Sequence, residues 1–300
     1  MTVVVGCTPK ESGSAALEMA AMLARSTEED VVVAVVVAAA WPPSPQPVDA
    51  EYYAEYRAYL TQRGERTLAQ AEAWMPADVK TTYLLHHAAS VPTGLLEVAQ
   101  QHDASALVLG SSESAGLGHV ALGSIADRIV HTSPDPVVLA PRGYRAEPGG
   151  RIRRVTAAFG STSKDRSLVL SAADYALRTG SSLRIASFSV RPRMHFAETL
   201  AGAGEDLVVD QWSRKVNEVI NEELDQVRRL PDVPRQLEVV IGEGYGWREA
   251  IGNARWSLGD LLVVGSSSHG PVASVFLGSR SSKILRYAPV PVMVLPRTHT

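Results

Sequence analysis

The sequence contains little cysteine, few aromatic residues and almost no excess charge. A single cysteine, Cys7, excludes an intrachain disulfide and leaves the Cys and His spacings of zinc sites unfilled. The formal net charge of −3, without blocks of like charge, argues against a nucleic-acid-binding surface. The apolar run 31–41 is too short to span a bilayer, and no basic signal-peptide region precedes it. We therefore predict a cytoplasmic protein with neither a nucleic-acid partner nor a membrane partner.

The usual motifs of catalysis and metal binding are also missing. The sequence has no Gly-x-Ser-x-Gly motif, and no lysine follows its glycine-rich loops as it would in a P-loop. No nucleophile, base and orienting group stand together in a recognisable pattern. We therefore predict a binding or regulatory protein and no enzyme, with a slow ATP hydrolase as an alternative. Four histidines match no familiar metal-ligand spacing, so we predict no metal site; they are His86, His87, His102 and His119.

What the sequence does contain is a long internal repeat. Three motifs recur 155 positions later: LVLGSS at 107–112 as LVVGSS at 262–267, LGS at 122–124 and at 277–279, and PDP at 134–136 as PVP at 289–291. A repeat of this length indicates two copies of a whole domain. The chain has 300 residues and is 45% hydrophobic, which suits two domains that each bury a core. We predict domain 1 at 1–145 and domain 2 at 151–300, with a polar, glycine-rich linker at 143–150.

Both halves alternate predicted strands and helices in βαβ order, which is typical of an open parallel sheet with helices on both faces. The predicted strands of the first half are 2–7, 31–37, 79–85, 106–109 and 136–140, and its helices are 14–25, 50–74, 91–102 and 124–131. The predicted strands of the second half are 154–159, 183–190, 236–241, 261–264 and 290–295, and its helices are 165–178, 207–230, 247–256 and 279–287. We predict an α/β fold with five parallel strands in each half.

A glycine-rich loop follows the fourth strand of each half, where open α/β sheets bind their ligands. Glycine at the strand end lets the backbone approach a ligand, and Gly-Ser at a helix start presents N–H groups and the positive end of the helix dipole to an anion. The serine can cap the helix or donate its hydroxyl to a phosphate. The alternative is a tight turn and a good helix start without a ligand. The candidate residues are Gly110, Ser111, Gly123 and Ser124 in the first half, and Gly265, Ser266, Ser268, His269, Gly278 and Ser279 in the second.

The loop motifs resemble the universal stress protein family. Its nucleotide-binding members carry Gly-x2-Gly-x9-Gly-Ser/Thr after the fourth strand and then Ala-Pro-x-Pro-Val, which is similar to 265–279 followed by APVPV at 288–292. The resemblance implies two tandem adenine-nucleotide α-hydrolase-like, Rossmann-like domains with strand order 3-2-1-4-5. It also implies ATP as a ligand and pairing of the two halves through the last strands, 136–140 and 290–295, as an intrachain pseudo-dimer. Dimerisation of the whole chain as a homodimer stays open.

The chain departs from the family pattern where the ligand is expected. The second motif glycine is replaced by Glu113 in the first half and by Ser268 in the second, and the adenine-reading aspartate is replaced by Thr8 and Gly160. A carboxylate about 5 Å from a phosphate costs roughly 1 to 3 kcal/mol, depending on the local dielectric constant. We therefore predict that domain 2 binds an adenine nucleotide more tightly than domain 1. The alternative is an interaction protein whose clefts no longer bind nucleotide.

Two further features of the sequence have more than one interpretation. Cys7 at the end of the first strand is either a small buried hydrophobic residue or a redox-sensitive thiol beside the cleft. Tyrosines repeat with helical spacing along 50–74, at Tyr52, Tyr53, Tyr56 and Tyr59. They are expected to pack that helix over the sheet or the other half, with a partner-binding face as the alternative.

Overall fold

The computed structural model describes residues 1–8, 11–38, 50–160, 166–191, 202–266 and 277–296. The chain divides into two compact units. Unit 1 contains Met1–Arg151, and unit 2 contains Ile152–Ser267 and Leu277–Arg297. No helix in the described residues is both long and apolar enough to cross a membrane.

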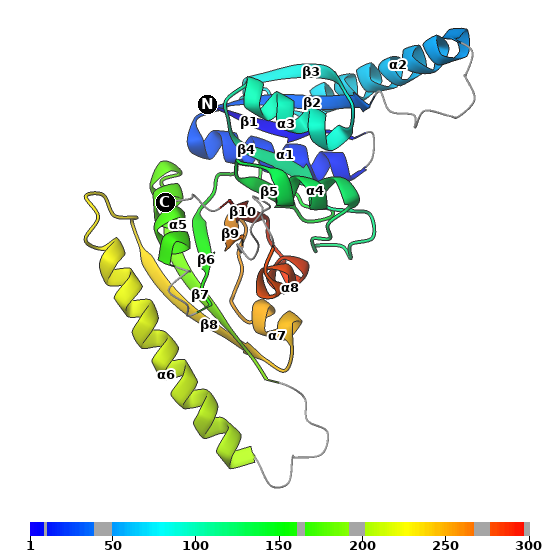
Figure 1. Ribbon diagram of the computed structural model, residues 1–300. Coiled ribbons are helices and arrows are strands. Elements are labelled where there is room, and N and C mark those ends of the chain that lie inside the picture. Colours follow the sequence, from blue (N-terminus) through cyan, green and yellow to red (C-terminus); the bar gives the residue numbers. More distant parts are fainter. Residues whose placement is uncertain (9–10, 39–49, 161–165, 192–201, 267–276, 297–300) are drawn as a thin grey trace. The chain divides into compact units, whose positions relative to one another are not determined.

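Unit 1 is built on a parallel sheet whose described strands lie in the order β3-β2-β1-β4-β5 (Figure 1). The strands are β1 (Thr2–Gly6), β2 (Asp30–Ala38), β3 (Thr81–Ala88), β4 (Ala104–Gly110) and β5 (Val137–Ala140). This order confirms the prediction for the first half. The strands are rich in valine because both faces of the sheet are covered, and Val3, Val4 and Val5 are fully buried.

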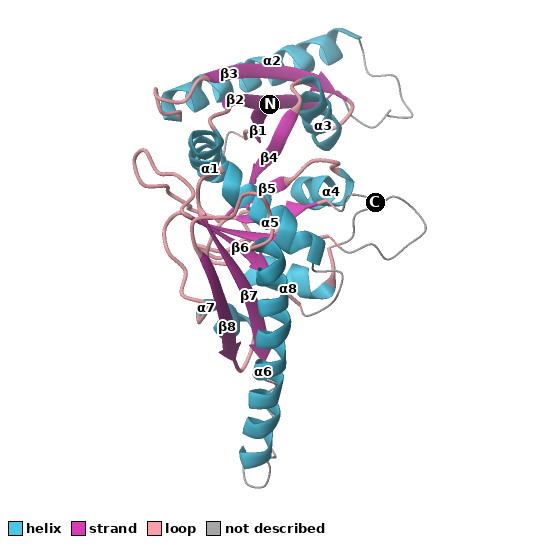
Figure 2. Cartoon of the chain, turned by 90° about the vertical axis from the view of Figure 1, so that its left-hand side faces the viewer, coloured by secondary structure: helices cyan, strands magenta, loops and turns pink. Residues whose placement is uncertain are grey.

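Two pairs of helices cover the two faces of the sheet in unit 1. The helices are α1 (Glu11–Thr27), α2 (Ala50–Trp74), α3 (Val91–Gln101) and α4 (Ser124–Thr132). Helix α1 packs with α2, and α3 packs with α4. Figure 2 shows α1 and α4 on opposite sides of the strands. The start of α3 is fixed by Ser90, whose Oγ accepts a hydrogen bond from the backbone N–H of Thr93.

Unit 2 repeats the same arrangement in the order β8-β7-β6-β9-β10, with every described pairing parallel. Its strands are β6 (Arg154–Ala158), β7 (Ser182–Val190), β8 (Leu237–Gly244), β9 (Asp260–Gly265) and β10 (Val292–Leu295). Its helices are α5 (Arg166–Arg178), α6 (Gly202–Val227), α7 (Trp247–Gly252) and α8 (Ser279–Tyr287). Helix α7 ends earlier than predicted, and Arg255 beyond it has a left-handed φ of 53°.

The described tyrosines of α2 do not pack against the sheet. The exposed fractions of Tyr56 and Tyr59 are 42% and 55%, and residues 54–59 are all exposed. Figure 1 shows this part of α2 extending beyond the strands of unit 1. The expectation that these tyrosines pack on the sheet is wrong for Tyr56 and Tyr59, because the helix continues past the sheet edge. The side chains of Tyr52 and Tyr53 lie outside the described part of the chain.

Candidate functional site

The two glycine-serine pairs lie at helix starts, as the sequence predicts. Gly123 is the N-cap of α4 and Gly278 is the N-cap of α8, and neither helix has a side-chain cap. Ser124 and Ser279 are the first helical residues, and both are exposed. Their expected role as caps is therefore wrong, because the glycine before each serine occupies the cap position. Donation of their hydroxyls to an anion stays a prediction.

The serine that follows each strand end is buried. Ser111 is 3% exposed, and its Oγ accepts a 2.8 Å hydrogen bond from the backbone N–H of Ala121. Ser111 therefore joins the two ends of the loop that follows β4. Ser266 is also 3% exposed, and its backbone N–H donates to the carbonyl oxygen of Leu295 at 3.2 Å. In the described residues both serines hold the strand ends together.

Internal packing does not explain the glycines at positions 123 and 265. A Cβ on Gly123 would come no closer than 3.6 Å to its described neighbours, and one on Gly265 no closer than 3.7 Å. These distances are ordinary van der Waals contacts. A small side chain would therefore fit at both positions, so the described packing does not require glycine there.

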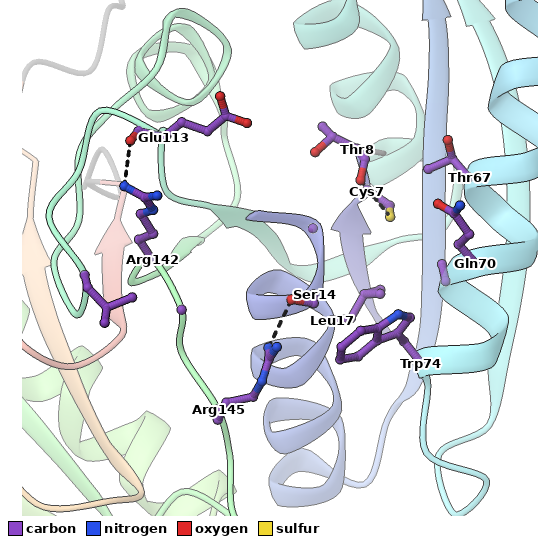
Figure 3. A pocket seen from close by; sticks show the side chains of 14 residues that line it. Cys7, Thr8, Ser14, Leu17, Thr67, Gln70, Trp74, Glu113, Arg142 and Arg145 are labelled. Atoms are coloured by element: carbon purple, nitrogen blue, oxygen red, sulfur yellow. Dashed lines mark hydrogen bonds between the residues drawn. The ribbon is translucent and has the colours of Figure 1, made fainter. Parts of the chain in front are cut away.

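Unit 1 contains a cavity of about 800 Å³ (Figure 3). It is lined from five parts of the unit: the chain after β1, helices α1 and α2, the loop after β4 and the chain after β5. Glu113 lies in this lining, as its place in the glycine loop predicts. Gly110, Ser111, Gly123 and Ser124 do not line the cavity. The cavity therefore lies beside the predicted anion site of unit 1.

Two arginines after β5 shape one wall of the cavity. Arg142 donates from Nη1 to the carbonyl oxygens of Glu113 and Ala115, both at 3.0 Å, and so fixes the loop after β4. Arg145 donates from Nη1 to Ser14 Oγ at 3.0 Å, and its guanidinium lies 5.1 Å from the ring centroid of Trp74. With two arginines and one glutamate, the lining has a formal charge of +1. The sequence did not indicate that two arginines would lie in the same lining as Glu113 and offset its negative charge.

Thr8 and Cys7 form the end of the cavity at the carboxyl end of β1. Gly13 lets the chain approach α1 closely here, because a Cβ at Gly13 would lie 2.6 Å from the carbonyl oxygen of Thr8. Burial raises the pKa of the Cys7 thiol from 9.0 to about 11, although a hydrogen bond with the backbone of Thr8 opposes the shift. Cys7 is therefore a protonated thiol at neutral pH, which does not favour the redox-sensitive interpretation.

The segment after β5 packs on α1. The phenol of Tyr144 donates to Met22 Sδ at 3.3 Å, and burial raises the pKa of this phenol. Gly143 has a left-handed φ of 71°, and a Cβ there would lie 2.6 Å from Leu117 Cδ1. The left-handed turn therefore favours glycine, whereas the exposed Leu117 side chain can turn away from a Cβ. The predicted linker thus begins with residues that belong to unit 1.

In unit 2 a basic side chain lies at the predicted anion site. Arg280, the second residue of α8, donates from Nη1 to the carbonyl oxygen of Gly160 at 3.1 Å. Ser281 donates from Oγ to the carbonyl oxygen of Gly265 at 3.1 Å. These bonds connect the helix start with the carboxyl ends of β6 and β9. Ser268 and His269 lie outside the described residues.

Arg280 was not among the predicted site residues, although the sequence contains a signal for it. The first turn of a helix favours acidic side chains, because its N-terminus carries a partial positive charge. A basic residue directly after Gly278-Ser279 runs against that preference. It is therefore a candidate for a ligand that supplies the missing negative charge.

The described histidines do not form a metal centre. Within the described ranges, no three His, Cys, Asp or Glu side chains are grouped closely enough to hold a metal ion. His86 lies on β3 and its Nε2 is 2.7 Å from Glu97 Oε2 on α3, which makes it a helix-to-sheet contact.

The two units are doubly wound α/β domains, a class of fold whose ligands, where it has them, bind at the carboxyl edge of the sheet. The profile of the Universal stress protein family matches residues 1–141 and 151–296. Curated universal stress proteins from Mycobacterium tuberculosis and Mycobacterium bovis are each 37% identical over 305 residues, covering 99% of this chain and 100% of theirs. A universal stress protein structure from Archaeoglobus fulgidus is similar in fold, with a TM-score of 0.61, 20% identity and coverage of 99% and 98% of the two chains. The chain belongs to the universal stress protein family.

Proposed function

We propose that this protein is a cytoplasmic stress-response protein that binds an adenine nucleotide, and that unit 2 binds it more tightly than unit 1. The observation that carries the proposal is the charge at the two helix starts. Helix α8 has Arg280 and no acidic residue in its first turn, whereas α4 has Asp127 in its first turn. Glu113 adds a second carboxylate near the loop of unit 1.

The nucleotide phosphates would contact the start of α8. Gly278 and Ser279 offer backbone N–H groups of the first helical turn, and Arg280 adds a guanidinium that forms directional bonds to phosphate oxygens. Gly265 has no side chain of its own to cover the end of β9. Ser268 and His269 complete the proposed set from the part of the loop outside the described residues.

Binding without catalysis fits the described residues around the start of α8. Ser281 and Arg280 are bonded to backbone carbonyl oxygens, and neither contact is a nucleophile paired with a base. In unit 1, burial raises the pKa of Cys7 and so disfavours the thiolate that would act as a nucleophile. We therefore propose that the protein responds to the nucleotide as a ligand and does not turn it over.

Isothermal titration of the full chain with ATP tests this proposal. Arg280→Gln removes the charge at the start of α8, and we expect it to weaken the tighter site about tenfold or more, since hydrogen bonds to charged groups contribute roughly 1.5–3 kcal/mol. Arg286→Gln in the last turn of the same helix is the matched control and is expected to leave the affinity unchanged. An absence of ATP binding, or an equal effect of both substitutions, would contradict the proposal.

A second candidate function is interaction with another protein without any nucleotide. It is favoured by the exposed aromatic side chains of Tyr56 and Tyr59 on the part of α2 that extends beyond the sheet. Mass spectrometry of small molecules released from the purified protein separates the two functions. Co-purified adenine nucleotide supports the first function, and its absence together with a silent titration supports the second.

A further inference from the structure

The part of the unit 1 cavity that lies between α1 and α2 has an exposed aromatic wall. Trp74, the last residue of α2, is 54% exposed although it lines the cavity. Figure 3 shows its indole beside Leu17 of α1, with Arg145 close by. Large aromatic side chains bury 150–250 Å² when they are covered, so a half-exposed indole inside a cavity leaves substantial apolar area for a ligand to cover.

The cationic groups of the cavity have unused hydrogen-bonding capacity. Arg142 and Arg145 form their hydrogen bonds through Nη1. Within the described residues the Nε and Nη2 groups of both side chains make no hydrogen bond. A guanidinium presents its donors as a planar fork that matches the two oxygens of a carboxylate.

The charge of the lining limits the charge of the ligand. The two arginines and Glu113 sum to +1, so a ligand with one negative charge neutralises the cavity, whereas a di- or triphosphate leaves several charges uncompensated near Glu113. The start of α4 is not part of the lining, so the cavity lacks the helix N-terminus that favours phosphate. Its volume of about 800 Å³ lies within the range of pockets for small organic ligands.

From the aromatic wall and the two guanidinium groups we infer that the cavity of unit 1 binds a small planar aromatic monocarboxylate. The ring of the ligand covers Trp74 and Leu17, and its carboxylate pairs with Arg145, while Arg142 adds positive charge to the lining. This site is separate from the nucleotide site proposed for unit 2, and it uses none of the predicted glycine-loop residues except Glu113. Unit 1 thereby has a ligand of its own, bound beside its weaker nucleotide site.

Isothermal titration of the full chain with indole-3-carboxylate tests this inference. We expect binding at one site per chain, about tenfold tighter than for cyclohexanecarboxylate, which has the charge without the aromatic ring, or for indole, which has the ring without the charge. AMP, with a more highly charged phosphate, is expected not to displace the indole-3-carboxylate. Tight binding of AMP in its place would overturn the inference, as would equal affinity for all three organic probes or no binding.

Substitutions in the cavity locate the bound probe. Arg145→Gln is expected to weaken indole-3-carboxylate binding about 10- to 100-fold, as loss of a charged hydrogen bond predicts. Trp74→Ala is expected to weaken it about two- to tenfold, with recovery in Trp74→Phe, which retains an aromatic face. The matched controls are Arg151→Gln and Tyr59→Ala, which replace exposed residues outside the cavity. If the controls weaken binding as much as the cavity variants, the probe binds elsewhere and the inference is wrong.

Discussion

Unit 1 and unit 2 fill the same positions of the same sheet with different chemistry. In unit 1 the third residues of β1 and β2 are Val4 and Val32, which pair in register and are buried. In unit 2 the corresponding pair is Thr156 and Arg184, also in register and also buried. One fold thus accepts either an apolar pair or a charged side chain at the same place in its core.

The buried guanidinium of Arg184 in unit 2 requires a network of hydrogen-bonding and charged partners. Arg184 donates from Nε to Thr156 Oγ1 at 3.1 Å and from Nη1 to the Ala254 carbonyl oxygen at 2.8 Å, and its guanidinium lies 4.6 Å from the ring centroid of Trp256. Asp260, 2% exposed, lies 3.6 Å from Arg184 Nη2. Burial, together with the charge of Arg154, lowers the pKa of Arg184 to about 10, so the group remains charged at neutral pH.

The difference also shows which end of the sheet is free to vary. The network lies at the amino ends of β6 and β9, because Arg154 and Asp260 are the first residues of those strands and pair with each other. Ligands of open α/β sheets bind at the carboxyl ends. The amino end can therefore exchange valine for an ionic network without changing the site, whereas substitutions at the carboxyl end, such as Glu113 and Arg280, change what can bind.

Asp260→Ala should cause the largest loss of stability, because it breaks the ionic network of unit 2. The carboxylate accepts hydrogen bonds from Arg154 Nε and Nη2 at 3.0 and 2.7 Å, and its loss leaves two arginines close together without it. Removing one partner of a buried ion pair costs about 3–5 kcal/mol of unfolding free energy. Urea denaturation measures the loss, with Asp225→Ala, half-exposed and paired with Arg228, as the control expected to change stability by under about 1 kcal/mol. Equal losses would show that the network does not stabilise unit 2.

Cys7 provides a probe that reports on unit 1 alone, because the chain has no other cysteine. The pKa of Cys7 is raised from 9.0 to about 11, so the thiolate fraction at pH 8 is about a hundredfold lower in the folded protein than in the unfolded chain. Alkylation by iodoacetamide at pH 8 should be slower by about that factor. Between pH 9 and 11 the unfolded chain loses this proton first, so this group's contribution to stability falls as pH rises. Equal alkylation rates in native and denatured protein would contradict the buried thiol.

Gly143→Ala should disturb the wall of the unit 1 cavity. The substitution places a Cβ at a left-handed φ, so we expect a loss of about 1–3 kcal/mol in the unfolding free energy of unit 1, to which the exposed Leu117 side chain, 2.6 Å from that Cβ, adds little because it can turn aside. Gly149→Ala is the matched control, because it has a similar φ of 66° but no atom within 4 Å. The difference between the two variants in urea denaturation isolates the contact with Leu117.

Glu113→Gly should have the smallest effect, on the nucleotide affinity of unit 1. The substitution restores the family glycine and removes a negative charge, but Glu113 is exposed, so we expect at most about a fivefold gain, the equivalent of roughly 1 kcal/mol in water-like surroundings. Titration with ATP in the Gly278→Asp background measures it, because that background removes the expected tighter site. If unit 1 binds ATP and its affinity does not change in Glu113→Gly, Glu113 does not face the phosphates.

The sequence predicted the order of strands and helices well because the hydrophobic pattern and the repeat act over short ranges. The differences between prediction and structure lie at the ends of the elements. The third strand was expected at 79–85 and is found at Thr81–Ala88, which places His86 and His87 on the strand. Arg184 could not be predicted as buried, because its partners Ala254 and Asp260 lie about 70 residues further along the chain.

The candidate site was predicted only in part for the same reason. The helix starts at Gly123 and Gly278 follow from a local signal. The contact of Arg145 with Ser14 and Trp74 joins segments that are distant in sequence, so the cavity could be recognised only from the folded chain.

The most direct test of the central claim compares two equivalent glycines. Gly123→Asp and Gly278→Asp each place a side chain and a negative charge at the N-cap of the helix that would bind phosphate, in unit 1 and in unit 2 respectively. Titration of ATP into each full-length variant measures the sites separately. We expect Gly278→Asp to abolish the tighter binding and Gly123→Asp to leave it intact. The reverse result, or equal losses in the two variants, would contradict this expectation.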